Sequence, residues 1–237
     1  MNFMLVHGAH MGGWSWKKVA EILTQHNHTV YTPTLTGLGE RQHLMVSTLN
    51  LNTHIDDIAN VIRFSDLDDI ILVGHSYAGV VIAGVNEIYT KKIRKLIFLD
   101  SFMPQSGKSI LECLPESYQE NWHLACQNYG HGWIFRKGNN AFERWGAHDK
   151  NIQVQYLDKI CDFSMHFLTT PIHLSKKFAE AEKIYIRCTK PSDAKNIMQS
   201  AYETAVKQGW KIHEIDADHI APITAPEKVA ELLLKLQ

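Results

Sequence analysis

Two residues of this sequence combine reactive side chains with a local context that suits nucleophilic catalysis, Ser76 and His219. Ser76 lies in the run GHSYAG (residues 74–79), which directly follows an apolar stretch and precedes a helical pattern. A serine on such a sharp strand-to-helix turn, flanked by small residues, can present its hydroxyl to a substrate. Ala78 stands where this pattern usually has glycine, and Gly79 follows. The run predicts a nucleophilic serine; the alternative is an ordinary serine in a tight turn.

A serine hydroxyl is a poor nucleophile unless a base takes its proton. His219 lies in the run DADHIAP (residues 216–222), between the last predicted strand and the last predicted helix. We expect it to be this base, since a histidine that comes last in the chain order suits a serine on such a turn. His75 is expected to point away from the nucleophile and pack. Asp218 cannot orient His219, because adjacent side chains diverge.

The first apolar run ends in HGAHMGGW (residues 7–14), a glycine-rich turn. Negative charge that develops on a carbonyl oxygen during acyl transfer needs preorganised backbone N–H donors. We expect the N–H groups of Ala9 and Tyr77 to be these donors, forming an oxyanion hole. The alternative is a plain turn whose glycines serve only its geometry.

These residues need a scaffold, and short β-branched runs alternating with helical patterns predict one. The alternation is typical of an α/β fold, with a mainly parallel sheet flanked by helices on both faces. The second helix is expected to have Asn52 or Thr53 as its cap. The strands are expected at 3–6, 29–32, 69–74, 95–99, 184–188 and 211–215, and the helices at about 14–26, 53–64, 78–89, 194–208 and 226–236. Strand 69–74 is the most hydrophobic and is expected at the centre of the sheet.

Residues 104–178 carry no strong strand pattern, so we expect a helical cap inserted into a single domain, 1–237. Ligand pockets are mostly apolar with a few polar groups, and aromatic residues of the cap are candidates to line one. Tyr77 and Phe102, beside the site, are stronger candidates for pocket walls, and His10 and His148 could contact substrate. The aromatic candidates in the cap are Trp122, Trp133, Phe135, Trp145 and Phe163.

Composition excludes several classes of protein. The formal net charge is −1 over 237 residues, so no long-range field attracts nucleic acid or an anionic membrane. A signal peptide and a membrane span are not expected either. Four widely spaced cysteines predict reduced thiols and a cytoplasmic protein. No spacing of ligands predicts a metal.

Four segments together resemble the methylesterase and hydroxynitrile lyase group of α/β-hydrolases. They are residues 7–14, TLTGLGER at 34–41, GHSY at 74–77 and the Asp218-His219 pair. The resemblance covers nearly the whole chain, is strongest over 3–105 and is weakest in the cap. It implies the α/β-hydrolase fold, no cofactor, and a carboxylesterase that acts on small apolar or aromatic esters through an acyl-serine. The expected partner is a small-molecule ester, and a homodimer is a possible assembly.

Two departures from this group concern the chemistry. The lyases of the group have threonine in the oxyanion turn and lysine directly after the histidine, whereas this chain has Gly8 and Ile220. A leaving cyanide needs a nearby positive charge, which Ile220 cannot supply, so ester hydrolysis is favoured. The alternatives are lyase, lactonase or thioesterase chemistry on the same scaffold. Pro191 leaves a further one open, a ligand-binding member that has lost catalysis.

The acid that should orient His219 is also in an unusual place. The group carries an aspartate two residues beyond a Cys-Thr pair, but here Lys190 and Pro191 follow that pair. Asp193 could substitute if the loop is rearranged. Asp100, at the end of the strand after the nucleophile helix, resembles the acid of haloalkane dehalogenases. Because neighbouring strands lie ~4.8 Å apart, the Asp100 carboxylate can reach the imidazole. We therefore expect Asp100 to be the acid that orients His219, with Asp193 as the alternative. The structural alternative for Asp100 is a carboxylate that caps a loop.

Overall fold

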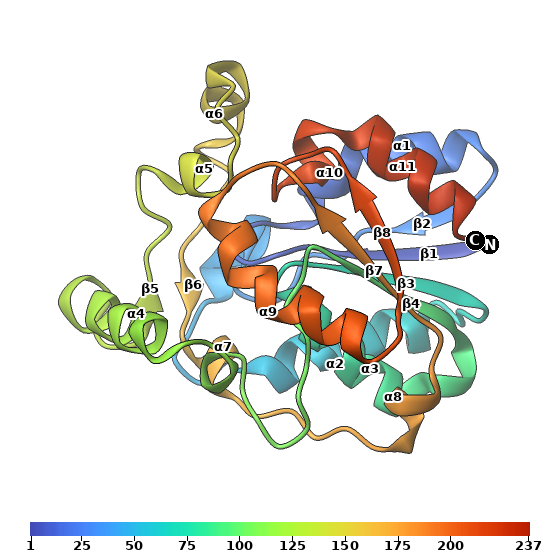
Figure 1. The fold of residues 1–237 in the computed structure, drawn as a ribbon, viewed down its shortest axis with the longest axis horizontal. Helices are drawn as coiled ribbons and strands as arrows, with labels where there is room; N and C mark the ends of the chain where they lie inside the picture. Colours follow the sequence, from blue (N-terminus) through green and yellow to red (C-terminus); the bar gives the residue numbers. More distant parts are fainter.

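The computed structural model describes all residues, 1–237, and a six-stranded parallel sheet forms its centre (Figure 1). The strand order is β2-β1-β3-β4-β7-β8, and every neighbouring pair is parallel. The strands are β1 (Asn2–Val6), β2 (Thr29–Tyr31), β3 (Ile70–His75), β4 (Ile93–Leu99), β7 (Lys183–Cys188) and β8 (Lys211–Ile215). All six residues of β3 are buried, which fits a strand at the middle of a parallel sheet. The predicted fold class, α/β with flanking helices, is confirmed.

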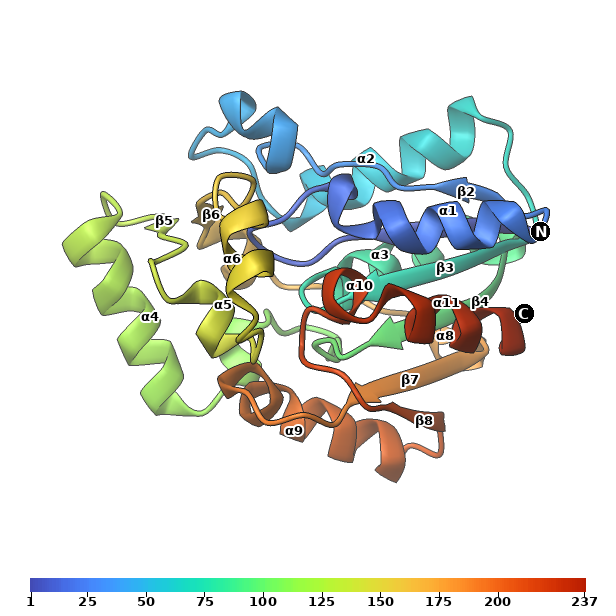
Figure 2. The ribbon, with the colours of Figure 1, turned by 90° about the horizontal axis from the view of Figure 1, so that it is seen from above.

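Alternate side chains of the strands point to opposite faces of the sheet and pack into two separate cores. Phe3 and Leu5 pack on one face beneath α1 (Lys17–Gln25) and α11 (Pro226–Lys235), whereas Met4 and Val6 pack on the other. That second face is covered by α2 (Leu51–Phe64), α3 (Ala78–Tyr89), α8 (Lys176–Glu180) and α9 (Asp193–Lys207). Figure 1 shows the two layers of helices with the sheet between them, and Figure 2 looks onto the face that α1 and α11 cover. This period of two is what a sheet buried on both faces requires.

The start of α2 differs from the prediction. Asn50 is the cap: its side chain accepts a hydrogen bond from the N–H of Asn52, and the hydroxyl of Thr53 accepts one from the N–H of Asn50. The prediction of Asn52 or Thr53 as cap is therefore wrong. The helix begins earlier because Leu51 is buried in the core and belongs to its apolar face.

Between β4 and β7 the chain forms a segment of short elements. They are η4 (Leu111–Cys113), α4 (Glu116–Tyr129), β5 (Ile134–Phe135), α5 (Ala141–Arg144), α6 (Lys150–Tyr156), β6 (Phe163–Ser164), α7 (His166–Thr169) and α8. We call residues 104–178 the cap segment; Figure 1 shows α4, α5 and α6 beyond the carboxyl ends of the strands. The antiparallel pair β5–β6 was not predicted, because two residues per strand are too few to show a period.

Short helical turns also precede four of the elements in the sheet layers. The 3-10 turns η1 (Gly13–Trp16), η2 (Gly39–Leu44) and η3 (Thr90–Lys92) precede α1, α2 and β4, and α10 (Ala221–Thr224) precedes α11. None of the helices has both the length and the apolar character needed to cross a bilayer.

Candidate active site

Ser76 sits on the turn between β3 and α3 in a left-handed backbone conformation, with φ of 54°. Its N–H donates to the carbonyl of Leu99, and its own carbonyl accepts from the N–H groups of Gly79 and Phe102. A residue other than glycine in this conformation is strained and is held only where its surroundings over-determine it. The three backbone bonds supply that constraint, so the turn holds the Ser76 side chain in a fixed direction.

Two glycines allow this turn to be as tight as it is. A β-carbon on Gly74 would lie 2.7 Å from the carbonyl oxygen of Ala78, and one on Gly79 would overlap the carbonyl of Phe102. Ala78 itself is accommodated as the first residue of α3. The close approach to the segment that follows β4 therefore requires glycine at 79, one position later than in the usual pattern.

His219 connects Ser76 to Asp100 through its two ring nitrogens. Nδ1 lies 2.7 Å from Oδ2 of Asp100, and Nε2 lies 3.0 Å from Oγ of Ser76. A carboxylate can only accept, so Nδ1–H donates to Asp100 and Nε2 is left to accept from the Ser76 hydroxyl. All three side chains are buried, and Ser76 keeps 7% of its surface exposed. This arrangement can remove a proton from Ser76 and stabilise the resulting imidazolium.

Asp100 is held where the sheet brings it. It directly follows β4, its N–H donates to the carbonyl of Ile186, and its Oδ1 accepts from the N–H of Cys188, both on the neighbouring strand β7. Asp193, the alternative acid, starts α9 and makes no hydrogen bond to His219. Asp218 accepts from the N–H of Ile220 and the hydroxyl of Thr224.

His75, which we expect to pack, is buried and also makes a hydrogen bond to the loop that carries His219. Its Nε2–H donates to the backbone carbonyl of His219 at 2.7 Å, and the two rings lie 4.9 Å apart. Burial lowers the pKa of His75 well below its usual range, so it is neutral at pH 7. His75 thus fixes the backbone of the loop that carries His219. Adjacency to Ser76 in the sequence gave no signal of this role.

The expected oxyanion donors have free N–H groups. Neither the amide of Ala9 nor that of Tyr77 makes a hydrogen bond within the protein. Next to Ala9, the N–H of Leu35 donates to Nε2 of His7, so Nδ1–H of His7 donates to the carbonyl of Gly8. Burial lowers the pKa of His7 to about 4 and keeps it neutral. Because a peptide plane points its C=O and N–H in opposite directions, this bond also fixes the direction of the Ala9 N–H.

A second buried histidine fixes Tyr77. Nε2–H of His54 donates to the carbonyl of Thr36, and Nδ1 accepts from the hydroxyl of Tyr77. Burial lowers the pKa of His54 to about 3. Two rings of the cap segment, those of Phe163 and Phe167, pack against Tyr77. The residue that would supply the second amide is therefore immobilised along its whole side chain.

A cavity of about 240 Å³ opens directly onto Ser76 and His219. Ala9, Tyr77, His10 and Phe102, all predicted near the site, line it. Its other walls come from the cap segment and from the first turns of α9: Tyr118, Trp122, Phe135, Arg144, Trp145, Phe163, Leu168, Asp193, Ala194, Ile197 and Met198.

Two sequence-based candidates lie away from this cavity. Trp133 stacks on His166 within the cap segment, and His148 is exposed. The contribution of α9 and Arg144 was missed, because nothing in a helical pattern indicates which end of the helix faces a distant serine.

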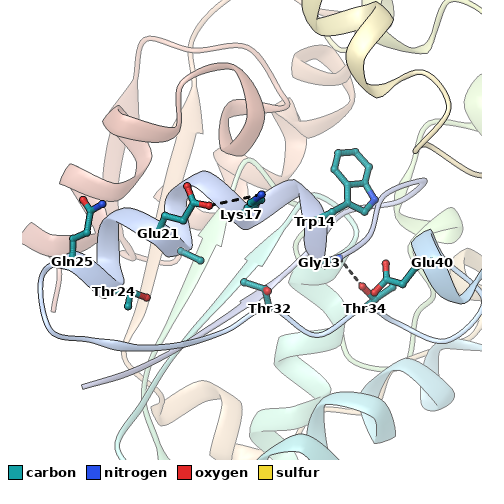
Figure 3. A pocket seen from close by; sticks show the side chains of 10 residues that line it. Gly13, Trp14, Lys17, Glu21, Thr24, Gln25, Thr32, Thr34 and Glu40 are labelled. Carbon is teal, nitrogen blue, oxygen red and sulfur yellow. Dashed lines mark hydrogen bonds and ion pairs between the residues drawn. The ribbon is translucent and has the colours of Figure 1, made fainter.

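A second depression lies between α1 and residues 32–40, where Figure 3 shows its lining side chains. It measures about 610 Å³ and is lined mainly by polar residues, among them Lys17 and Glu21, which form an ion pair of 4.0 Å one turn apart on α1. Neither Ser76 nor His219 reaches it. The smaller cavity is therefore the candidate active site.

Comparison with known proteins gives the family. Residues 3–232 match the profile of the "Alpha/beta hydrolase family". The chain is 48% identical to a carbendazim hydrolyzing esterase of Nocardioides sp. (strain SG-4G) over 116 residues, a match that spans 49% of this chain and 48% of that esterase. It is 25% identical to Salicylic acid-binding protein 2 of Nicotiana tabacum, across 99% of this chain and 96% of that protein. The solved structure of an extracellular alpha/beta-hydrolase from a Paenibacillus species superposes with a TM-score of 0.86 at 24% identity, covering 99% of this chain and 98% of that one.

The chain therefore belongs to the α/β-hydrolase family, and its six-stranded sheet with flanking helices is the α/β-hydrolase fold. Within this family, the resemblance to the methylesterase group is confirmed. Esterases among the relatives support hydrolase activity.

Proposed function

We propose that this protein is a serine carboxylesterase that cleaves small apolar or aromatic esters through an acyl-Ser76 intermediate. One observation carries the proposal: Ser76, His219 and Asp100 are joined by hydrogen bonds of 3.0 and 2.7 Å at the wall of an apolar cavity. Such a cavity suits an ester with an apolar group. Ser76 is the proposed nucleophile, His219 the general base and Asp100 the acid that orients it.

The reaction follows from the positions of these groups. Oγ of Ser76 attacks the ester carbonyl carbon while Nε2 of His219 takes its proton. The free N–H groups of Ala9 and Tyr77 donate to the carbonyl oxygen as it becomes negative. His219 then gives its proton to the departing alcohol oxygen. Water, deprotonated by His219, hydrolyses the acyl-serine by the same steps in reverse.

Two positions favour ester hydrolysis over cyanohydrin cleavage. A β-carbon on Gly8 would lie 2.9 Å from both Nδ1 of His75 and the β-carbon of Ser76, so the turn has no room for threonine. Ile220 is fully buried in an apolar cluster with Met11 and Phe142 and offers no positive charge to a leaving anion.

The test is hydrolysis of p-nitrophenyl acetate and butyrate by the Ser76→Ala and His219→Ala variants. Each substitution should lower kcat by about 10⁶-fold, as loss of either group does in a serine protease. Circular dichroism should show that both variants keep the wild-type fold, although His219→Ala is expected to unfold at a lower temperature because it leaves Asp100 buried without a partner. Turnover that survives in either folded variant would end the proposal.

A further inference from the structure

The cavity contains one side chain built to accept a hydrogen bond from a ligand, that of His10. Its Nδ1 lies 2.9 Å from the carbonyl oxygen of Cys161. Since a carbonyl can only accept, Nδ1 carries the proton and Nε2 carries a lone pair. Nε2 makes no hydrogen bond within the protein, and unlike a fully buried atom it keeps some accessible surface. Its lone pair is therefore open to the cavity that His10 lines.

The position of His10 is over-determined. Its backbone is left-handed, with φ of 65°, and its carbonyl accepts from the N–H of Cys161 while its ring donates back to the same residue. Three aromatic rings surround the imidazole, those of Phe135, Trp145 and Phe163, at centroid distances of 5.5–6.1 Å. Strain of this kind persists at sites where one geometry matters. The ring cannot turn to use its lone pair elsewhere without losing the bond to Cys161.

His10 also remains an acceptor across the physiological range. It is 5% exposed, and burial lowers its pKa to about 4. A neutral imidazole with Nδ1 protonated accepts at Nε2 and cannot donate there.

The neighbours of His10 indicate where the ligand's donor must be and what charge the ligand has. His10, Ala9 and Ser76 line the same cavity of about 240 Å³, so an ester whose carbonyl lies at Ser76 also faces His10 across this small space. The two charged residues that line the cavity, Arg144 and Asp193, carry opposite charges. These opposite charges give the cavity no net preference for an anion or a cation.

We propose that the natural substrate is a neutral ester with a hydrogen-bond donor, an N–H or O–H group, next to its carbonyl, and that Nε2 of His10 accepts this bond. This inference rests on the proposed function and makes it more specific. It makes His10 a specificity-determining residue, with carbamate esters (N–H) and α-hydroxy esters (O–H) as the two chemical sources of the donor.

Three methyl esters of similar shape test the inference. Methyl phenylacetate has a CH₂ group next to the carbonyl, methyl N-phenylcarbamate has N–H there, and methyl mandelate has CH(OH). For the carbamate and for the mandelate, kcat/KM is divided by kcat/KM for methyl phenylacetate. This ratio is then compared between wild type and His10→Phe, so that the intrinsic reactivity of each ester cancels. Each ester is also measured as a competitor of p-nitrophenyl acetate, so that one with slow turnover still reports its binding.

For the ester whose donor His10 accepts, the ratio should fall about tenfold in His10→Phe, the size of one buried hydrogen bond. A fall with the carbamate alone assigns an N–H donor, and a fall with the mandelate alone assigns an O–H donor. His10→Asn, which suits a left-handed backbone but is too short to keep the acceptor in place, should give the same result if His10→Phe folds poorly. Phe135→Leu, which alters a contact of His10 without a polar atom, should change all three esters alike.

Ratios that stay within about twofold of wild type in a folded His10 variant, less than one hydrogen bond contributes, would overturn the inference. Hydrolysis of p-nitrophenyl acetate in the same preparations separates the two claims. If wild type hydrolyses it and Ser76→Ala does not, the esterase proposal stands whatever the ratios show. If Ser76→Ala retains that activity, the esterase proposal itself fails.

Discussion

Asp100 accepts the Nδ1–H of His219 from the end of β4, and β4 is the strand that pairs with the one leading to Ser76. Its other oxygen is fixed by the N–H of Cys188 on β7. The carboxylate is thus held by backbone on both sides, which gives His219 one orientation and one tautomer. Asp193, at the first position of α9, can be explained by the favourable interaction of a carboxylate with a helix N-terminus.

Asp100→Asn and Asp193→Asn should therefore behave differently. An amide at 100 can donate to Nδ1 and so stabilise the wrong tautomer of His219, and we expect kcat to fall by about 10⁴-fold, as in a serine protease with the same change. Asp193→Asn should change kcat only a few-fold. Steady-state rates with p-nitrophenyl butyrate decide between them, and equal small losses would mean that neither carboxylate orients His219.

The sequence favoured Asp100 but could not exclude Asp193. Both candidates follow a predicted strand, and which one reaches the imidazole depends on the order of strands in the sheet. That order, with β7 beside β4, comes from tertiary packing that local patterns do not report. Ser76 and His219 were easier to predict, because each lies in a local context that has few other uses.

The turn after β1 is organised by His7. Its imidazole accepts from Leu35 and donates to Gly8, so it ties the turn to the segment after β2 and sets the plane of the Gly8–Ala9 peptide. The strands and long helices of the sheet layers could be predicted from their apolar periods, and even the three-residue β2 was found because Pro33 follows it. The short pieces of the cap segment and α10 could not, because their form depends on contacts with the rest of the chain.

His7→Leu should lower kcat more than it raises KM. Without the bond to Gly8, the Ala9 N–H is no longer held in one direction, and loss of one oxyanion donor reduces kcat by about 10²- to 10³-fold. We expect a smaller loss, about tenfold, since the amide remains present. His7→Gln can restore a donor to Gly8 and should recover part of kcat. A pure change in KM, or a loss matched by unfolding, would show that His7 has only a structural role.

Across the whole fold, four histidines are buried and neutral. The pKa values of His7 and His10 are lowered to about 4, that of His54 to about 3, and that of His75 well below its usual range, in each case mainly by burial. All four have a ring hydrogen bond that joins separate parts of the chain or fixes a turn. They connect the proposed catalytic machinery to the core and to the cap segment.

These histidines should make the protein acid-sensitive. In the unfolded chain they take up protons near pH 6.5, the usual value, while the folded chain takes them up only near pH 4 or below. The unfolded state therefore binds more protons between these values, and stability falls as the pH is lowered through that range. Each histidine contributes roughly 1.4 kcal/mol per unit of pH.

Urea unfolding at several pH values measures this dependence, which should be steep below about pH 6.5 and flat, as far as these groups are concerned, above about pH 7.5. His54→Asn should remove the share of one histidine from the slope. Stability that is unchanged between pH 7 and pH 5 would show that the buried histidines do not stay neutral.

Labelling with a fluorophosphonate, followed by peptide mass spectrometry, tests the central claim most directly. The reagent forms a covalent bond only with a serine whose hydroxyl is activated by a base. The account predicts stoichiometric labelling of Ser76 in the wild-type protein and none in folded His219→Ala. A protein that stays unlabelled, or carries the label on another residue, would contradict it.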